Sequence, residues 1–200
     1  GAVQAAPSGV VISTEELREI MAAGKIPVFD VRPAKEYAVS HIPGSVNIFE
    51  KDVERIMERC PDKAAGLVLY CNGPYCGKTI RVGEQLVQKG YTNVKKYQHG
   101  LPVWRAFGNT AVTDIEGVRK VYSADKTAVF IDARPKSEFE AGTLPGSVNM
   151  KHGEAEAANK HGRLPYTDHG TRVIVFGNNP DQARQLTEEI AQRAYWNSSY

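Results

Sequence analysis

The sequence predicts an α/β protein built from two tandem copies of one domain, each a mainly parallel sheet flanked by helices. The first observation is a repeat: Asp-Val-Arg-Pro at residues 30–33 returns as Asp-Ala-Arg-Pro at 132–135, and Ile-Pro-Gly-Ser-Val-Asn at 42–47 returns as Leu-Pro-Gly-Ser-Val-Asn at 144–149. Both matches are separated by the same 102 positions, which indicates a duplicated unit. The second observation is that short apolar runs alternate with amphipathic segments, a pattern typical of parallel sheets.

The first copy is expected to span residues 10–109. Ser13 to Glu16 fits a capping box, so a helix is expected to begin there. The run 67–70 is apolar throughout, as in a strand that helices cover on both faces. The expected elements are, in order, a helix from Ser13, a strand at 28–30, a helix at 53–60, a strand at 67–70, a helix at 79–89 that ends at Gly90, a strand at 91–97 and a short closing segment at 100–107 that contains Trp104 as a core anchor.

The second copy is expected to span residues 114–200, with a boundary near Gly108, where the apolar pattern lapses. It contains an apolar strand at 172–176 followed by a helix. Nothing in it corresponds to the closing segment of the first copy. We therefore expect that the chain has been cut or that further residues follow Tyr200.

The composition narrows the class of protein. Hydrophobic residues make up 42% of the chain and charged residues 24%, which favours a packed core over disorder. A formal charge of +2 gives no reason to expect nucleic acid or an anionic membrane as a partner. No apolar run approaches the roughly 18 residues of a membrane helix. His152, His161 and His169 have no usual metal-site spacing, so neither a metal nor a cofactor is expected.

The N-terminal residues and the number of cysteines give information about the cellular compartment of the protein and the state of its thiols. The residues from Gly1 to Pro7 are small and fit what remains after a secretory signal is removed, which favours a periplasmic or otherwise exported protein. An ordinary flexible terminus on a cytoplasmic protein is the alternative. The 3 cysteines, Cys60, Cys71 and Cys76, are too few for a disulfide scaffold, and their odd number leaves at least one thiol free.

The chemistry is expected in the loop that follows the strand at 67–70. Cys71 stands at the carboxyl end of that strand and just before a helix, where parallel α/β sheets bind their ligands. The amides at a helix start bind anions and favour a thiolate, the nucleophilic form of cysteine. Gly73 and Gly77 are expected to let the loop bend so that its amides converge, and Lys78 adds a positive charge.

These motifs closely resemble the rhodanese (thiosulfate sulfurtransferase) family over nearly the whole chain, and the loop looks most like a subgroup that reads Tyr-Cys-x-Gly-Pro-x-Cys. The resemblance implies that Cys71 takes a sulfane sulfur as a persulfide and passes it to cyanide or a thiol. It also implies a small sulfur-containing anion, thiosulfate or a polysulfide-like compound, as sulfur donor, a thiol or protein as sulfur acceptor, and substrate binding by the rest of the loop. The residues so assigned are Asn72, Gly73, Pro74, Tyr75, Cys76, Gly77 and Lys78.

Two departures from that family follow. Many rhodaneses carry an arginine where this chain has Cys76, so recognition of substrate charge is expected to fall to Lys78, together with Arg81. Aligning residues 68–74 with 174–180 places Gly177 where the nucleophile belongs, so the second copy resembles an inactive partner domain.

Several residues are expected to be structural. Asp30 and Arg32 recur in the copy that lacks a cysteine, which favours a structural salt bridge that holds the strand end over a catalytic role. His41 has no counterpart in the repeat, because Thr143 stands there. We expect it to support the fold.

Three functions remain open on the sequence. The first is sulfur transfer through Cys71. The second is a redox-sensing or sulfur-binding module without turnover, which a second loop cysteine, Cys76, favours. The third is a cysteine phosphatase or arsenate-type enzyme, which the lysine at 78 disfavours because lysine lacks the bidentate fork of arginine. Because a loop that turns its amides inward directs other side chains outward, Cys71 is expected to be free at rest and to bond to Cys76 only under oxidant.

Overall fold

The computed structural model describes residues 7–165 and 168–200, which fall into two compact units. The first unit comprises the chain up to Tyr37 and residues 44–104, and the second comprises residues 38–43 and 105–200. Residues 1–6, which carry most of the case for export, lie outside the described residues.

The first unit contains a parallel sheet of 5 strands in the order β1-β5-β4-β2-β3. The apolar run at 67–70 becomes its central strand, as the sequence predicts. The strands are β1 (Val10–Val11), β2 (Val28–Asp30), β3 (Val46–Asn47), β4 (Leu67–Tyr70) and β5 (Val94–Tyr97). The helices are α1 (Thr14–Ala23), α2 (Ala34–Val39), the 3-10 turn η1 (Glu50–Asp52), α3 (Val53–Arg59), α4 (Lys78–Gln88) and α5 (Gly100–Ala106).

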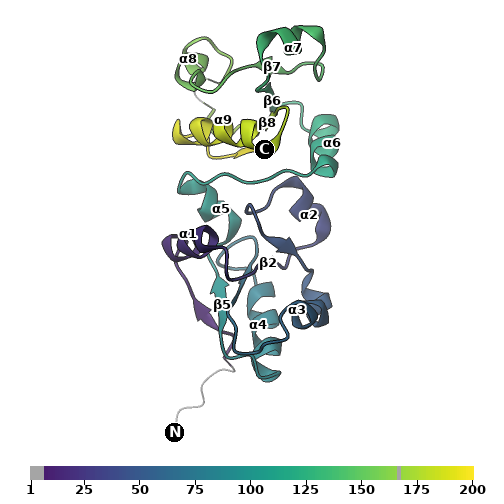
Figure 1. The fold of residues 1–200 in the computed structure, drawn as a ribbon, viewed down its shortest axis with the longest axis vertical. Helices are drawn as coiled ribbons and strands as arrows, with labels where there is room; N and C mark the ends of the chain where they lie inside the picture. The colour runs from purple at the N-terminus through teal and green to yellow at the C-terminus, as the bar shows by residue number, and fades with distance from the viewer. Residues whose placement is uncertain (1–6, 166–167) are drawn as a thin grey trace. The chain divides into compact units, whose positions relative to one another are not determined.

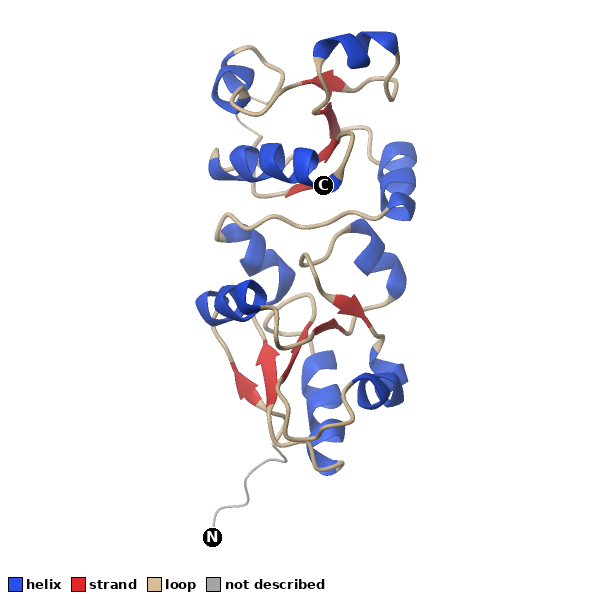
Figure 2. Ribbon diagram, in the orientation of Figure 1, coloured by secondary structure: helices blue, strands red, loops and turns tan. Residues whose placement is uncertain are grey.

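Helices cover both faces of this sheet (Figures 1 and 2). Leu67 and Leu69 point to one face, where they pack in one core with Ile56 of α3 and Leu86 of α4. The other face carries α1 and α5 (Figure 1). Because β4 is buried along its whole length, the residue that follows it is placed firmly at the carboxyl edge of the sheet.

The second unit repeats this architecture. Its parallel sheet has 4 strands in the order β7-β6-β8-β9, which matches β3-β2-β4-β5 of the first unit. A parallel bridge between Ala111 and Ser199 stands where β1 pairs with β5 in the first unit. The elements are α6 (Ile115–Ala124), β6 (Val129–Asp132), α7 (Lys136–Ala141), β7 (Val148–Asn149), α8 (Ala155–Lys160), β8 (Val173–Phe176), α9 (Pro180–Gln192) and β9 (Ser198–Ser199).

Local chemistry sets the element boundaries. Ser13 caps α1 as the sequence predicts, because its hydroxyl accepts a hydrogen bond from the Glu16 N–H at 3.1 Å. The strand expected from Tyr91 begins only at Val94. Tyr91 instead completes the turn after α4: its N–H donates to Leu86 O at 3.1 Å and its hydroxyl donates to Cys60 O at 2.6 Å.

None of the helices in the described ranges, 7–165 and 168–200, is long and apolar enough to span a membrane.

Candidate active site at Cys71

Cys71 lies at the carboxyl end of β4, between the ends of β2 and β5. Its residue is only 1% exposed, and it packs with the core of the first unit. The loop from Asn72 to Gly77 then leads into α4, whose first residue is Lys78. Strand end, loop and helix start therefore meet at the carboxyl edge of the sheet, the edge at which parallel α/β sheets bind ligands.

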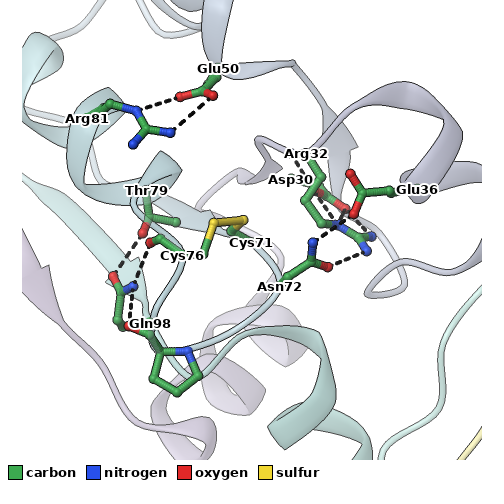
Figure 3. The surroundings of a disulfide bond; sticks show 11 residues. Asp30, Arg32, Glu36, Glu50, Cys71, Asn72, Cys76, Thr79, Arg81 and Gln98 are labelled. Atoms are coloured by element: carbon green, nitrogen blue, oxygen red, sulfur yellow. Dashed lines mark hydrogen bonds and ion pairs between the residues drawn. A yellow bond between two sulfur atoms is a disulfide. The ribbon is translucent and has the colours of Figure 1, made fainter.

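Cys71 and Cys76 are joined by a disulfide in the structure, with their Cα atoms 6.4 Å apart (Figure 3). The expectation that Cys71 is free at rest is therefore wrong for the structure described. The physical reason is the path of the loop. The Cys76 N–H donates to Gly73 O at 3.0 Å, which folds the chain back, and Cys76 packs half-buried against the core rather than pointing outward.

Gln98, which follows β5, holds this folded loop. Its side-chain amide donates to Pro74 O at 3.2 Å and to Cys76 O at 3.1 Å, and its Oε1 accepts a hydrogen bond from the Thr79 hydroxyl at 2.8 Å (Figure 3). The Gln98 side chain thus links the backbone of the loop, at Pro74 and Cys76, to Thr79 in the first turn of α4.

Gly100 brings α5 against the same loop. It has φ +74°, and a Cβ built on it lies 2.5 Å from Gly73 N and 2.7 Å from Cys71 O. The Leu101 N–H donates to Cys71 O at 3.2 Å. Only glycine combines this backbone conformation with so close an approach.

Gly77 does not play the part expected of it, whereas Gly73 has φ +158°, a backbone conformation that residues with a side chain rarely adopt. Gly77 has φ −76° and ψ −8°, an ordinary helical conformation that other residues adopt. A Cβ there meets the guanidinium of Arg81, a flexible side chain, at 2.6 Å. The close approach that requires glycine comes from Gly100, outside the loop.

Asp30 and Arg32 form the salt bridge that the sequence predicts, and the structure shows that it is buried. The guanidinium Nη2 donates to Asp30 Oδ2 at 2.7 Å, and Nε donates to Oδ1 at 3.0 Å. Burial lowers the pKa of Arg32, but the hydrogen bond and charge of Asp30 outweigh it and raise the pKa above its ordinary value. The pair also reaches the loop, because Arg32 Nη1 donates to Asn72 Oδ1 at 3.1 Å (Figure 3).

Asn72 is further held by Glu36 of α2, whose Oε1 accepts from its amide at 2.7 Å (Figure 3). This link recurs in the second unit, where the Asn178 amide donates to Glu138 at 3.2 Å. The ion pair recurs too, as Arg134 with Asp132 at 2.8 Å. Both interactions occur in each of the two units, so they belong to the shared fold, and they fix the position of the Asn72 side chain.

Positive charge at the site comes from two sources. Lys78 is half-buried at the start of α4. The first helical bond of α4 runs from Arg81 N–H to Gly77 O at 3.0 Å, so the N–H groups of residues 78–80 have no i−4 acceptor within the helix. The Arg81 side chain is held by Glu50 at 3.0 Å and is 57% exposed.

The other loop residues lie on the outside. Asn72 and Pro74 are exposed, and Tyr75 is fully exposed at 100%. The structure thus brings Cys71, Cys76 and the start of α4 together but leaves the Tyr75 side chain in solvent.

The corresponding loop of the second unit is shorter and differently filled. Helix α9 begins at Pro180, the counterpart of Pro74, whereas α4 begins only at Lys78. Gln182 stands in the place of Cys76, and its Oε1 accepts from the Asn178 N–H at 2.7 Å. That oxygen lies 2.5 Å from a Cβ built on Gly177, so it fills the space that a side chain at this position would enter.

An apolar cavity of about 700 Å³ lies beside Gly177 in the second unit. Phe130, Ile174, Phe176 and Tyr200 contribute to its wall, and no lining residue is charged or carries a thiol. The cavity does not repeat the chemistry of the Cys71 loop.

The remaining candidates have structural contacts. His169 stacks on Tyr195 with ring centroids 4.3 Å apart, and His152 lies 3.6 Å from Glu189. No group of 3 or more potential metal ligands occurs in the part of the chain that the structure describes. Trp104 is buried, and Cys60 is a buried free thiol whose pKa is raised by burial, despite the opposing charge of Arg59.

Sequence reasoning missed Glu36, Gln98 and Gly100 as residues that shape the site. Glu36 carried a signal, since it recurs as Glu138 within the repeat. Gln98 and Gly100 carried none, because their roles depend on β5 bringing them beside a loop more than 20 residues earlier in the chain.

The comparisons with known proteins agree with this architecture. The chain is 33% identical over 101 residues to an HTH-type transcriptional regulator of Mycobacterium tuberculosis, covering 48% of this chain and 42% of that protein. It is 37% identical over 78 residues to thiosulfate sulfurtransferase PspE of Escherichia coli, covering 35% and 72%. It is 29% identical over 107 residues to thiosulfate:glutathione sulfurtransferase of Homo sapiens, covering 46% and 90%.

The family model described as "Rhodanese-like domain" matches residues 13–107 and, a second time, residues 118–200. The two matches fall on the two sheets and together cover most of the chain. The chain therefore belongs to the rhodanese-like domain family, and it carries two such domains in tandem.

Proposed function

We propose that the first domain is a sulfurtransferase that carries a sulfane sulfur on Cys71 as a persulfide. The observation that supports this most is the position of Cys71 at the carboxyl end of β4, beside the start of α4. Since the thiolate is the form that attacks, the Cys71–Cys76 disulfide must first be reduced.

The surroundings of Cys71 favour that thiolate. The positive end of the α4 dipole stabilises an anion by about 0.3–1 kcal/mol, and up to about 2 kcal/mol where the site is partly buried. Lys78 adds a full charge at the same end of the helix. The same groups also attract an anionic sulfur donor. The start of α4 and Lys78 would therefore both bind the donor and stabilise the Cys71 thiolate.

The donor and acceptor classes are proposed from the relatives. Both sulfurtransferases to which the chain is similar have thiosulfate in their names, and one also has glutathione. We infer a small sulfane-sulfur anion such as thiosulfate as donor and a thiol or cyanide as acceptor. The second domain is proposed to be catalytically silent, because Gly177 has no nucleophile and Gln182 fills its place.

The test is turnover of reduced protein with thiosulfate and cyanide, followed as thiocyanate. Cys71→Ser is expected to abolish thiocyanate formation while urea unfolding stays as in the parent protein. Cys60→Ser is the matched control, since Cys60 is the third cysteine, a buried free thiol outside the loop, and it is expected to keep full activity. Undiminished turnover by Cys71→Ser would refute the proposal.

A second function, a redox-sensing module without turnover, is favoured by one observation, the Cys71–Cys76 disulfide. The same assay separates the two proposals. A sensor reacts once with its oxidant or sulfur donor and then stops, whereas a sulfurtransferase forms many equivalents of thiocyanate per protein.

A further inference from the structure

We propose that Cys76 is the built-in acceptor for the Cys71 persulfide, so that the first domain reduces sulfane sulfur to hydrogen sulfide. The inference rests on the proposed function, because it needs the persulfide, and it names the step that follows. The Cys71–Cys76 disulfide in the structure is then the product of that step, before an external dithiol reduces it.

The geometry of the loop supports an attack by Cys76. The two cysteines are 5 residues apart, and their Cα atoms at 6.4 Å lie within the range of about 4.4–6.8 Å that a disulfide requires. Both side chains pack against the same core. The attacking thiol is therefore held next to its target, which gives it a large advantage over a thiol free in solution.

The backbone around Cys76 is held in that position by other groups. Its N–H donates to Gly73 O at 3.0 Å, and its carbonyl accepts from Gln98 at 3.1 Å. A carbonyl two residues earlier, on Pro74, accepts from the same amide at 3.2 Å. Bonding of the two sulfurs thus fits the hydrogen bonds that define the loop.

The chemistry balances in two steps with thiosulfate as the donor. The Cys71 thiolate attacks the outer sulfur of thiosulfate, the S–S bond of thiosulfate breaks, and sulfite leaves. The Cys76 thiolate then attacks Sγ of Cys71, the bond from Sγ to the outer sulfur breaks, and hydrosulfide leaves with the electron pair. The two thiols are oxidised to one disulfide, and the sulfane sulfur is reduced to sulfide.

The exposure of the two cysteines indicates how the enzyme is reset. Cys71 is 1% exposed whereas Cys76 is half-buried, so a dithiol from solution reaches Cys76 Sγ more readily. Attack there releases Cys71 as the thiolate, beside the helix start that stabilises it. The second thiol of the reductant then frees Cys76 and leaves as a disulfide.

The test is a single turnover of fully reduced protein, freed of reductant under anaerobic conditions and mixed with one equivalent of thiosulfate. Wild type is expected to release one equivalent of sulfide and to lose about 2 Da, the mass of two hydrogens, as the disulfide forms. Cys76→Ser is expected to gain about 32 Da, one persulfide sulfur, and to release sulfide at least about 10-fold more slowly. Cys60→Ser is expected to behave as wild type.

The outcomes separate this inference from the proposed function. If Cys76→Ser gains the sulfur and wild type also keeps it, with no sulfide released, Cys76 is not the acceptor and only the further inference fails. If Cys76→Ser gains no sulfur, the persulfide itself is refuted and both proposals fail. Sulfide release from wild type that Cys76→Ser matches in rate would also overturn the role of Cys76.

Discussion

Replacing Gly100 with alanine should displace the Cys71 loop, because the added Cβ meets backbone that has no free side chain to move. That Cβ lies 2.5 Å from Gly73 N, 2.7 Å from Cys71 O and 2.8 Å from Asn72 C. Overpacking of this kind costs about 1–3 kcal/mol. The left-handed conformation of Gly100, with φ +74°, adds about 1–2 kcal/mol for a residue with a Cβ. We expect a total loss of about 2–5 kcal/mol in the free energy of unfolding.

Gly24→Ala is the matched control. Gly24 ends α1 with φ +65°, close to that of Gly100, but a Cβ there has nothing within 4 Å. It therefore carries the conformational cost alone, about 1–2 kcal/mol. The difference between the two variants isolates the contact with the loop.

The assay is urea unfolding followed by tryptophan fluorescence in a Trp196→Phe background, which leaves Trp104 as the reporter of the first unit. Single-turnover loading of thiosulfate sulfur is measured beside it. Gly100→Ala is expected to load sulfur at least about 10-fold more slowly, since small displacements of a reacting group are costly, while Gly24→Ala loads normally. Equal losses of stability in the two variants, with equal loading rates, would refute the account of Gly100.

Three further predictions follow from the polar contacts. Arg32→Ala should lower the free energy of unfolding by about 3–5 kcal/mol, because it leaves the buried Asp30 carboxylate without its cation. Arg134→Ala should lower it by less, since the Arg134 side chain is 23% exposed. Urea unfolding of the two variants measures both losses. Burial raises the pKa of Asp132, but hydrogen bonds from Arg134 outweigh the burial and hold the pKa below its ordinary value in the folded protein. The ionised Asp132 therefore stabilises the fold above about pH 4, and this stabilisation is lost as the pH falls through the pKa of the folded state. Unfolding curves in which Asp132→Asn has the same acid dependence as wild type would contradict this. Gln98→Glu replaces a donor by a carboxylate facing two carbonyls and should cost about 1–3 kcal/mol, whereas unchanged unfolding would show that this side chain does not hold the loop.

The features that depend on local patterns could be predicted from the sequence. The repeat and the alternation of apolar runs predict two parallel sheets, and both are confirmed. The cap at Ser13 joins residues that are 3 positions apart in the chain, and the ion pair joins Asp30 to Arg32, which are 2 positions apart. Each of these can be inferred without knowing which distant segments meet.

The features that depend on distant segments could not be predicted. Whether Cys71 meets Cys76 depends on a turn closed at Gly73 and on Gln98, which reaches the loop from the end of another strand. General reasoning about inward-facing amides therefore led to the wrong orientation for Cys76. The close approach that only glycine allows is made by Gly100, outside the loop, since it brings two distant segments together.

Whether Cys71 carries the sulfane sulfur is decided by locating that sulfur in the Cys76→Ser variant. The reduced variant is treated with thiosulfate, alkylated and digested with trypsin, which releases residues 64–78 as one peptide. We expect fragmentation to find one additional sulfur, about 32 Da, between residue 71 and its alkyl group. A Cys71 that carries only the alkyl group, or an additional sulfur found on Cys60 instead, would contradict it.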